Sequence, residues 1–222
     1  MLKEKLLNYL KNYNTYFSSR IEDNERIFKN INKLLKFLDK KEILSSSKLL
    51  DLGSGDKSFY KVCLKNGVDA KEIDGASEGI DFEKDKLPYD DNIFDYVYFC
   101  AVIEHLYDAN PILSEIFRVL KKGGVLITIT PNFTLCYKEF YNDPTHFHPY
   151  TPKSLKKILE MNQFKDNVIN PFLINKSTNY WKIPYKFYIA SVLPFRNDSF
   201  QKFPIPIFFR GKSTSMISVS EK

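Results

Sequence analysis

Apolar residues in the first 44 positions recur every three or four residues, which is the spacing of one helix face. A polar break interrupts this stripe after Phe17, and the stripe is too short to indicate a coiled coil. We therefore predict an N-terminal helical cap over residues 1–44, followed by a main domain that covers residues 45–222. The apolar stripe consists of Leu2, Leu6, Leu10, Tyr13, Phe17, Ile27, Ile31, Leu34, Leu35 and Leu38.

After residue 45 the pattern changes to short apolar runs that alternate with amphipathic segments. Alternating strands and helices are typical of a parallel sheet that is covered by helices on both faces. The stretch 75–92 contains glycine, proline and aspartate, so we expect a loop where a helix usually follows the second strand. We predict strands at 48–52, 70–74, 96–100, 125–130, 168–174 and 216–219, and helices at 58–66, 110–120 and 152–161.

A glycine turn, Gly53-Ser54-Gly55, lies between the first strand and the helix that follows it. Glycines suit a position where a ligand lies against the backbone, because any Cβ would intrude there. Asp74 lies 21 residues after Gly53 at the end of the next strand, where a carboxylate can accept hydrogen bonds from ribose hydroxyls. Asp74 can also be read as a solvated acid in a turn, but together the two features favour a nucleoside cofactor.

The same turn argues against a dinucleotide. The third glycine of a dinucleotide fingerprint is replaced by Ser58, and Asp56 places a negative charge where a pyrophosphate would lie. A positively charged cofactor, for example one that carries a sulfonium and an ammonium group, tolerates this carboxylate.

A series of motifs between Lys48 and Phe164 resembles the class I S-adenosylmethionine-dependent methyltransferases, and in particular those of type 11. The motifs occur in the family's order and cover more than half of the chain. Lys122 stands where the family usually has a proline. The matching segments are Asp51–Gly55, Asp74, Asp81–Lys84, Leu87–Asp95, Val102–Leu106, Arg118–Gly124 and Thr130–Asn132.

The resemblance implies a fold and a cofactor. The fold would be a Rossmann-like α/β architecture with a mostly parallel sheet of seven strands, helices on both faces and an antiparallel last strand. S-adenosylmethionine would lie across the carboxyl ends of the strands, and S-adenosylhomocysteine would be the product.

The resemblance also implies a set of cofactor-binding residues. Asp74 would hold the ribose hydroxyls and Asp81 the adenine amino group, with Phe82 beside the ring. Only six residues separate Asp74 from Asp81, so the adenine pocket can differ from that of the family. The complete expected set is Asp51, Gly53, Ser54, Gly55, Asp74, Asp81, Phe82, Cys100 and Ala101.

Two of the three histidines, His146 and His148, lie in the loop just before the helix predicted at 152–161. In the family's fold this loop passes over the acceptor side of the site. A histidine can accept a proton near neutral pH, as methylation of a hydroxyl requires. We therefore expect His146 or His148 to act as the base or to bind the acceptor, with Asp143 orienting it. In the alternative interpretation the loop only packs and forms hydrogen bonds.

A metal site is a further alternative. Some methyltransferases bind a divalent ion through an ExxEH motif, but here Ala101 replaces the first acid before Glu104 and His105. We therefore expect no metal ligands and a structural role for His105. If the loop folds over, His105, His146 and His148 could still form a site with three nitrogen ligands.

The net charge of the chain is concentrated at its C-terminal end. Residues 176–222 contain 8 basic and 2 acidic residues and account for the whole net charge of +6, together with 10 of the 34 aromatic residues. We interpret residues 175–212 as an insertion before the last strand that serves as a lid or an acceptor platform. Its lysines would attract an anionic partner, such as a phosphate, an acidic glycan or a membrane surface. The alternatives are a solvated basic surface and an aromatic helix that packs on the core.

Three widely spaced cysteines, Cys63, Cys100 and Cys136, indicate reduced thiols and a cytoplasmic protein. The N-terminus carries charges every few residues and has no apolar core of a signal peptide. No run is long enough for a membrane span. We expect a cytoplasmic location, with peripheral contact to a membrane as an alternative, and leave the oligomeric state open.

The loop sequence Asp143–His146 followed by Pro149–Pro152 resembles that of methyltransferases associated with bacterial surface polysaccharides. We therefore expect O-methylation of a sugar, a glycan precursor or another small polar acceptor, with anionic and lipid-linked molecules included. The alternatives are a quinone, lipid or natural-product methyltransferase and a non-catalytic binding module. Nucleic acid is disfavoured, because Cys100–Ile103 lacks the (D/N)PP(Y/F) motif of enzymes that methylate amino groups.

Overall fold

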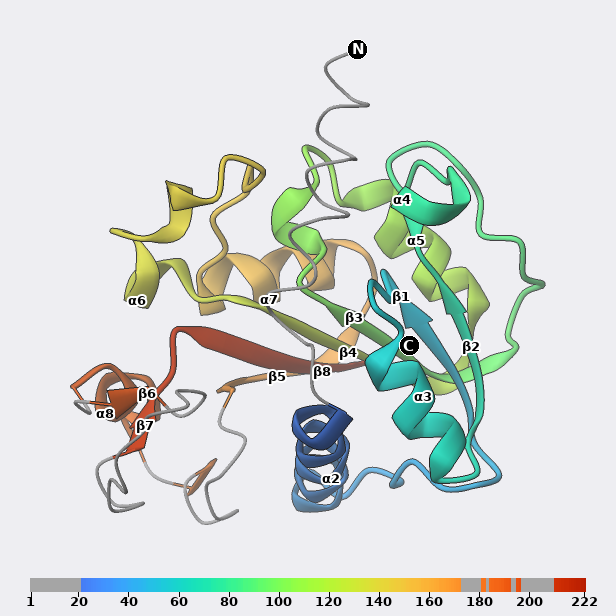
Figure 1. The fold of residues 1–222 in the computed structure, drawn as a ribbon, viewed down its shortest axis with the longest axis horizontal. Helices are drawn as coiled ribbons and strands as arrows, with labels where there is room; N and C mark the ends of the chain where they lie inside the picture. Colours follow the sequence, from blue (N-terminus) through green and yellow to red (C-terminus); the bar gives the residue numbers. More distant parts are fainter. Residues whose placement is uncertain (1–20, 173–180, 183, 193–194, 197–209) are drawn as a thin grey trace.

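The computed structural model describes residues 21–172, 181–182, 184–192, 195–196 and 210–222. A mixed sheet of six strands forms the centre of this part of the chain, in the order β2-β1-β3-β4-β8-β5 (Figure 1). Neighbouring strands are parallel except around β8, which runs antiparallel to both β4 and β5. The strands are β1 Lys48–Leu52, β2 Asp69–Ile73, β3 Phe94–Cys100, β4 Leu120–Pro131, β5 Lys165–Pro171 and β8 Ser215–Glu221.

The predicted α/β architecture and the antiparallel last strand are confirmed, but the predicted number of seven strands is wrong for this sheet. The difference arises between β2 and β3, where the chain forms the helical turn α4 (Gly75–Glu78) and then turns and bends around Pro88. Proline cannot donate a hydrogen bond to a strand ladder. This segment adds no strand, and β2 therefore remains at the edge of the sheet.

Helices cover both faces of the sheet, as predicted: α2 and α3 pack on one face, and α5 and α7 on the other (Figure 1). Successive side chains of a strand point to opposite faces, so Leu49 enters the first core and Leu50 the second. This arrangement explains why residues 49–52 of β1 are all buried. The helices are α2 Ile21–Phe37, α3 Ser58–Lys65, α5 Asn110–Val119 and α7 Pro152–Met161.

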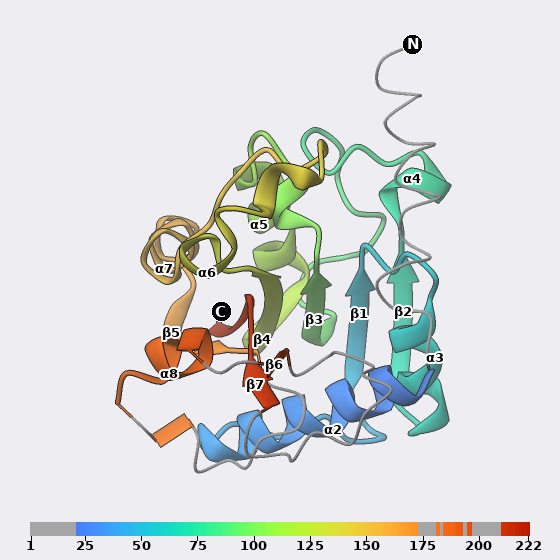
Figure 2. The same ribbon diagram turned by 60° about the vertical axis from the view of Figure 1, so that its left-hand side comes forward.

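The carboxyl ends of β1, β2 and β3 point toward the same end of the molecule (Figure 2). At this end, the chain leaves β1 through the glycine turn and leaves β2 into α4. From β3 it enters a short 3-10 helix, η1 (Ile103–His105). These three connections build the site described below.

The two ends of the chain are described in part. A helix is confirmed in the predicted cap from residue 21 onward, whereas residues 1–20 lie outside the described residues. Within the predicted insertion, the structure describes α8 (Lys186–Val192) and a short parallel pair, β6 (Phe195–Arg196) and β7 (Arg210–Lys212). The domain boundaries and the role of the insertion as a lid stay predictions. None of the described helices has the length and apolar character that crossing a bilayer requires.

Candidate active site

The glycine turn after β1 folds back onto the end of β2. The amides of Gly53 and Ser54 both donate to the carbonyl of Ile73, at 2.8 and 3.3 Å. Gly53 has a φ of +79°, and a Cβ built on it would lie 2.3 Å from Cγ2 of Val102. The glycine is therefore required by the chain's own packing, whereas the sequence had suggested the approach of a ligand.

Asp74 connects this turn to the end of β2. Its Oδ2 accepts a hydrogen bond from the amide of Gly55 at 3.1 Å, and its Oδ1 accepts one from the amide of Ser77 at 2.9 Å. The side chain is buried, with 8% of the residue exposed, so the interpretation as a solvated acid is wrong. Each carboxylate oxygen keeps a second lone pair, which is what binding of two ribose hydroxyls requires.

Glu72 is a residue of the site that the sequence reasoning missed. Its carboxylate accepts hydrogen bonds from Oγ of Ser54 at 2.6 Å and from Nζ of Lys57 at 2.5 Å. Burial opposes ionisation of Glu72, but these two hydrogen bonds outweigh it and lower its pKa. The sequence could have indicated Glu72. Side chains two positions apart along a strand point to the same face, and Glu72 precedes Asp74 by two positions.

Asp51 lies beneath the same turn and is 2% exposed. It accepts a hydrogen bond from the amide of Tyr60 at 3.1 Å. Burial is the main cause that raises the pKa of Asp51 to about 8, and the neighbouring carboxylates of Glu72, Asp56 and Asp74 raise it further. Such a group of acids fits a cofactor that carries positive charge, because a sulfonium or an ammonium would stabilise the ionised forms.

Asp81 and Phe82 follow α4. Asp81 accepts a hydrogen bond from the amide of Glu83 at 3.2 Å and pairs with Lys84 at 2.9 Å. Phe82 is buried in the core that also contains Ile73. Their assignment to the adenine group stays a prediction.

Cys100 and Ala101 end β3. Burial raises the pKa of Cys100 to about 12, so the sulfur is a neutral thiol at physiological pH. Ala101 is exposed and has a φ of +53°, which is uncommon for a residue with a Cβ. This sharp turn directs the chain from β3 into η1, and it places Val102 against Gly53.

The loop that carries His146 and His148, here called the histidine loop (residues 143–151), contacts η1. After β4 the chain forms α6 (Phe133–Cys136) and η2 (Phe140–Asn142), and the loop follows. The amides of Phe147 and His148 both donate to the carbonyl of Glu104, at 2.9 and 3.0 Å. The loop therefore folds over η1, which the sequence alone had left open.

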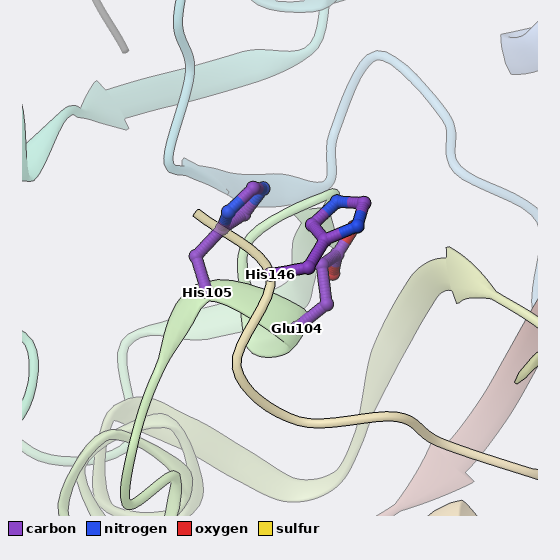
Figure 3. A group of neighbouring side chains, drawn as sticks. All are labelled: Glu104, His105 and His146. Atoms are coloured by element: carbon purple, nitrogen blue, oxygen red, sulfur yellow. The ribbon is translucent and has the colours of Figure 1, made fainter. Parts of the chain in front are cut away.

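Three side chains meet where the loop touches η1: Glu104, His105 and His146 (Figure 3). The two imidazole rings have centroids 4.8 Å apart. Glu104 is 1% exposed, and burial raises its pKa to about 7. Burial also lowers the pKa of His105, with a further contribution from His146. Sequence reasoning identified Glu104 only as part of a motif, because its burial depends on contacts across the fold.

The hydrogen bonds fix the proton of each imidazole on Nδ1. The hydroxyl of Thr145 donates to Oδ1 of Asp143 at 2.6 Å, so it must accept from Nδ1 of His105 at 2.8 Å. Nδ1 of His146 lies 2.7 Å from the carbonyl of Phe140, which can only accept. In the neutral state, both histidines therefore carry a free lone pair on Nε2.

The other two predicted catalytic residues occupy different positions. Oδ2 of Asp143 lies 3.9 Å from Nε2 of His146, beyond hydrogen-bond distance, and Asp143 instead reaches His105 through Thr145. His148 stacks on Tyr150 with ring centroids 5.1 Å apart. It lines a hollow beside α7 and is not a member of the cluster formed by Glu104, His105 and His146. The catalytic roles of Asp143 and His148 stay predictions.

The fold and these residues fit one class, an α/β protein that binds a nucleoside cofactor at the carboxyl ends of its parallel strands. Residues 19–168 match the family model described as a methyltransferase domain, and the chain belongs to this family. It is a class I S-adenosylmethionine-dependent methyltransferase, and S-adenosylmethionine is its cofactor.

Comparisons with individual proteins agree with this family. The chain is 32% identical over 181 residues to an uncharacterised protein of Methanocaldococcus jannaschii. The match covers 71% of this chain and 77% of that protein. It is 27% identical over 125 residues to a ubiquinone biosynthesis O-methyltransferase of Pelagibacter ubique, over 49% of this chain and 52% of that one. The fold is similar to that of a SAM-dependent methyltransferase from Archaeoglobus fulgidus, with a TM-score of 0.58 and 19% identity over 90% and 94% of the two chains.

Proposed function

We propose that the protein transfers the methyl group of S-adenosylmethionine to a hydroxyl oxygen of a small-molecule acceptor. The observation that supports this reaction is the cluster of Glu104, His105 and His146. Two of its members closely follow Val102, which lies against Gly53 of the glycine turn (Gly53–Gly55, the cofactor turn). In-line transfer mainly needs alignment of donor and acceptor, but a hydroxyl must also lose its proton. Two imidazoles with free Nε2 lone pairs beside a carboxylate suit this step.

The acceptor class has two candidates. A phenolic quinone precursor is supported by the name of the Pelagibacter ubique relative, which covers half of the chain. A sugar or a glycan precursor, anionic or lipid-linked, is supported by the loop resemblance alone. We therefore place the phenol first and the sugar second. In both cases the protein would work in the cytoplasm, and it would contact a membrane surface only if the acceptor is lipid-linked.

The test is a transfer assay with S-adenosylmethionine that carries a deuterated methyl group. A dihydroxybenzoate and a hexose serve as acceptors, and the same phenol with both hydroxyls already methylated is the matched control. We expect a methyl ether on the free phenol and none on the control. A methyl group found only on carbon or nitrogen would contradict the proposal.

The first mutational prediction tests whether His146 acts as the base. Because general-base catalysis contributes roughly 10²- to 10⁴-fold, we expect His146→Ala to lower turnover by an amount in that range. Glu139→Gln changes an exposed acid in the segment before the loop and is the matched control. His148→Ala is expected to lose less activity, since His148 packs on Tyr150 outside the cluster. Equal turnover in His146→Ala and the control would remove His146 from the reaction.

A further inference from the structure

We propose that Glu104, His105 and His146 bind one divalent transition-metal ion. One potential ligand atom of each residue lies within 4.8 Å of those of the other two, at the contact of η1 with the histidine loop (Figure 3). Metal–ligand distances of about 2.0–2.2 Å place neighbouring ligand atoms somewhat closer than this. The ion would therefore draw the three side chains closer together.

The hydrogen bonds around the two imidazoles are those of metal-binding histidines. Such a histidine usually donates its second N–H to a carbonyl or a carboxylate, which fixes the ring and leaves the other nitrogen for the metal. His146 donates Nδ1–H to the carbonyl of Phe140. His105 donates to the hydroxyl and the carbonyl of Thr145, and that hydroxyl donates onward to Asp143. Both rings therefore keep Nε2 for a ligand.

The surroundings of Glu104 call for a cation. Its side chain is buried and accepts a hydrogen bond from Oγ1 of Thr130 at 3.0 Å. Within the described ranges, no lysine or arginine forms an ion pair with it. A carboxylate that is ionised when buried is normally paired with a cation or coordinates a metal. A divalent ion held between Glu104 and the two imidazoles would supply the missing positive charge.

The donor set indicates which ions fit. Two imidazole nitrogens with one carboxylate favour Zn²⁺, Mn²⁺, Fe²⁺ or Co²⁺, whereas Mg²⁺ prefers oxygen ligands and retains water. This site also differs from both sites considered from the sequence. Glu104 provides the third ligand in place of His148, and no acid is required at Ala101.

Three protein ligands leave coordination positions open for an acceptor. This part of the inference rests on the proposed O-methylation. With both Nε2 atoms bound to the ion, the imidazoles would no longer act as bases, and a hydroxyl bound to the ion would instead release its proton to solvent water near neutral pH. The alkoxide or phenoxide oxygen would then form the new bond to the methyl carbon while the bond from that carbon to sulfur breaks. The products would be the methyl ether and S-adenosylhomocysteine.

The first experiment measures binding without any assay of activity. The full chain, without a polyhistidine tag, is stripped with a chelator. It is then titrated with Co²⁺, followed by its visible absorption, and with Zn²⁺ and Mg²⁺ by calorimetry. We expect one ion per chain and a ligand-field spectrum of the bound Co²⁺. Absence of binding in the unmodified chain, or binding of Mg²⁺ but of neither transition metal, would overturn the inference.

Variants then locate the ion. Loss of an outer hydrogen bond alone weakens metal sites by about 10- to 100-fold, so we expect losses of at least about 100-fold in Glu104→Gln and in His146→Ala. His148→Ala, in the same loop, is the matched control for metal binding. Circular dichroism checks that each variant is folded. If both ligand variants bind as tightly as the control, the ion lies elsewhere and the assignment is wrong.

The last measurement separates this inference from the proposed function. We expect the metal-free enzyme to lose methyl transfer to the phenol and to recover it with Zn²⁺ or Mn²⁺. Unchanged ether formation by metal-free enzyme would leave the O-methylation standing and overturn the role of the ion. Metal binding without methylation of any hydroxyl would have the opposite meaning, since the site would be confirmed and the proposed reaction contradicted.

Discussion

At the scale of single residues, the connections after β1 and β2 each contain a glycine in a backbone conformation that other residues rarely adopt. Gly53 and Gly79 both have a positive φ, at +79° and +74°. They differ in their surroundings, because a Cβ on Gly53 would overlap Val102 whereas one on Gly79 would meet no atom within 4 Å. The pair therefore separates the cost of backbone strain from the cost of a steric clash.

We expect Gly53→Ala to destabilise the protein by more than Gly79→Ala. The strain of a left-handed conformation costs on the order of 1 kcal/mol at either position, and Gly53→Ala must also displace Val102. Urea unfolding of both variants measures the difference. Equal free energies of unfolding would mean that Val102 moves aside without cost and that its contact with Gly53 has no structural importance.

The raised pKa of Asp51 predicts how the stability of the protein depends on pH. Its pKa is about 8 in the folded chain, against an ordinary value of 3.8 for an aspartate in water, so the folded chain holds an extra proton between these values. The unfolded chain then binds fewer protons, and the contribution of Asp51 to stability falls as pH rises from about 4 to about 8. Asp51→Asn removes this dependence.

The measurement for Asp51 is urea unfolding of the variant and the wild type at several pH values between about 5 and 8. We expect the free energy of unfolding of Asp51→Asn to rise relative to wild type across this range. Asp69→Asn, which changes an exposed acid at the start of β2, should show no such trend. A constant difference between Asp51→Asn and wild type would contradict the raised pKa.

At the scale of the elements, α7 carries the histidine loop on its amino end. Thr151 begins this helix with a capping box, in which its Oγ1 accepts from the amide of Ser154 and Oγ of Ser154 accepts from the amide of Thr151. The signal was visible in the sequence as a threonine followed by Pro152. Local rules of this kind predicted most strands and helices to within a few residues.

We expect Thr151→Ala to destabilise the protein by about 1 kcal/mol, because one helical amide loses its acceptor. Thr151→Ser keeps a hydroxyl at the same position and should lose much less. Chemical unfolding compares the two variants, and a loss of equal size in both would show that the cap is not what stabilises α7.

Elements and contacts that depend on distant parts of the chain were less predictable. The seventh strand was expected from the family, but the chain between β2 and β3 turns without adding one. Glu72 and Glu104 become site residues only when Ser54 and Thr130 meet them in space. The pairing of His105 with His146 likewise depends on where the loop after β4 lies. The cofactor residues on local turns could be predicted, whereas these partners could not.

At the scale of the whole molecule, the charge around the cofactor turn decides which ligand is accepted. Three carboxylates surround the protonated Asp51 in this region, those of Asp56, Glu72 and Asp74, and Lys57 pairs with one of them. The resulting negative potential favours the ammonium and sulfonium groups of S-adenosylmethionine and opposes the pyrophosphate of a dinucleotide. The helix that follows the turn also begins at Ser58 where a dinucleotide fold has a glycine.

We therefore expect the folded chain to distinguish an adenosyl amino acid from a dinucleotide in a thermal unfolding experiment. A ligand at 100 times its Kd stabilises the folded state by about 2.7 kcal/mol, and each kcal/mol raises the Tm of a chain of this size by about 2–4 °C. S-adenosylhomocysteine at that concentration should thus raise the Tm by roughly 5–10 °C. NAD⁺ at the same concentration should raise it by much less, because its pyrophosphate would face the carboxylates. A comparable shift with NAD⁺ would show that these acids do not control ligand choice.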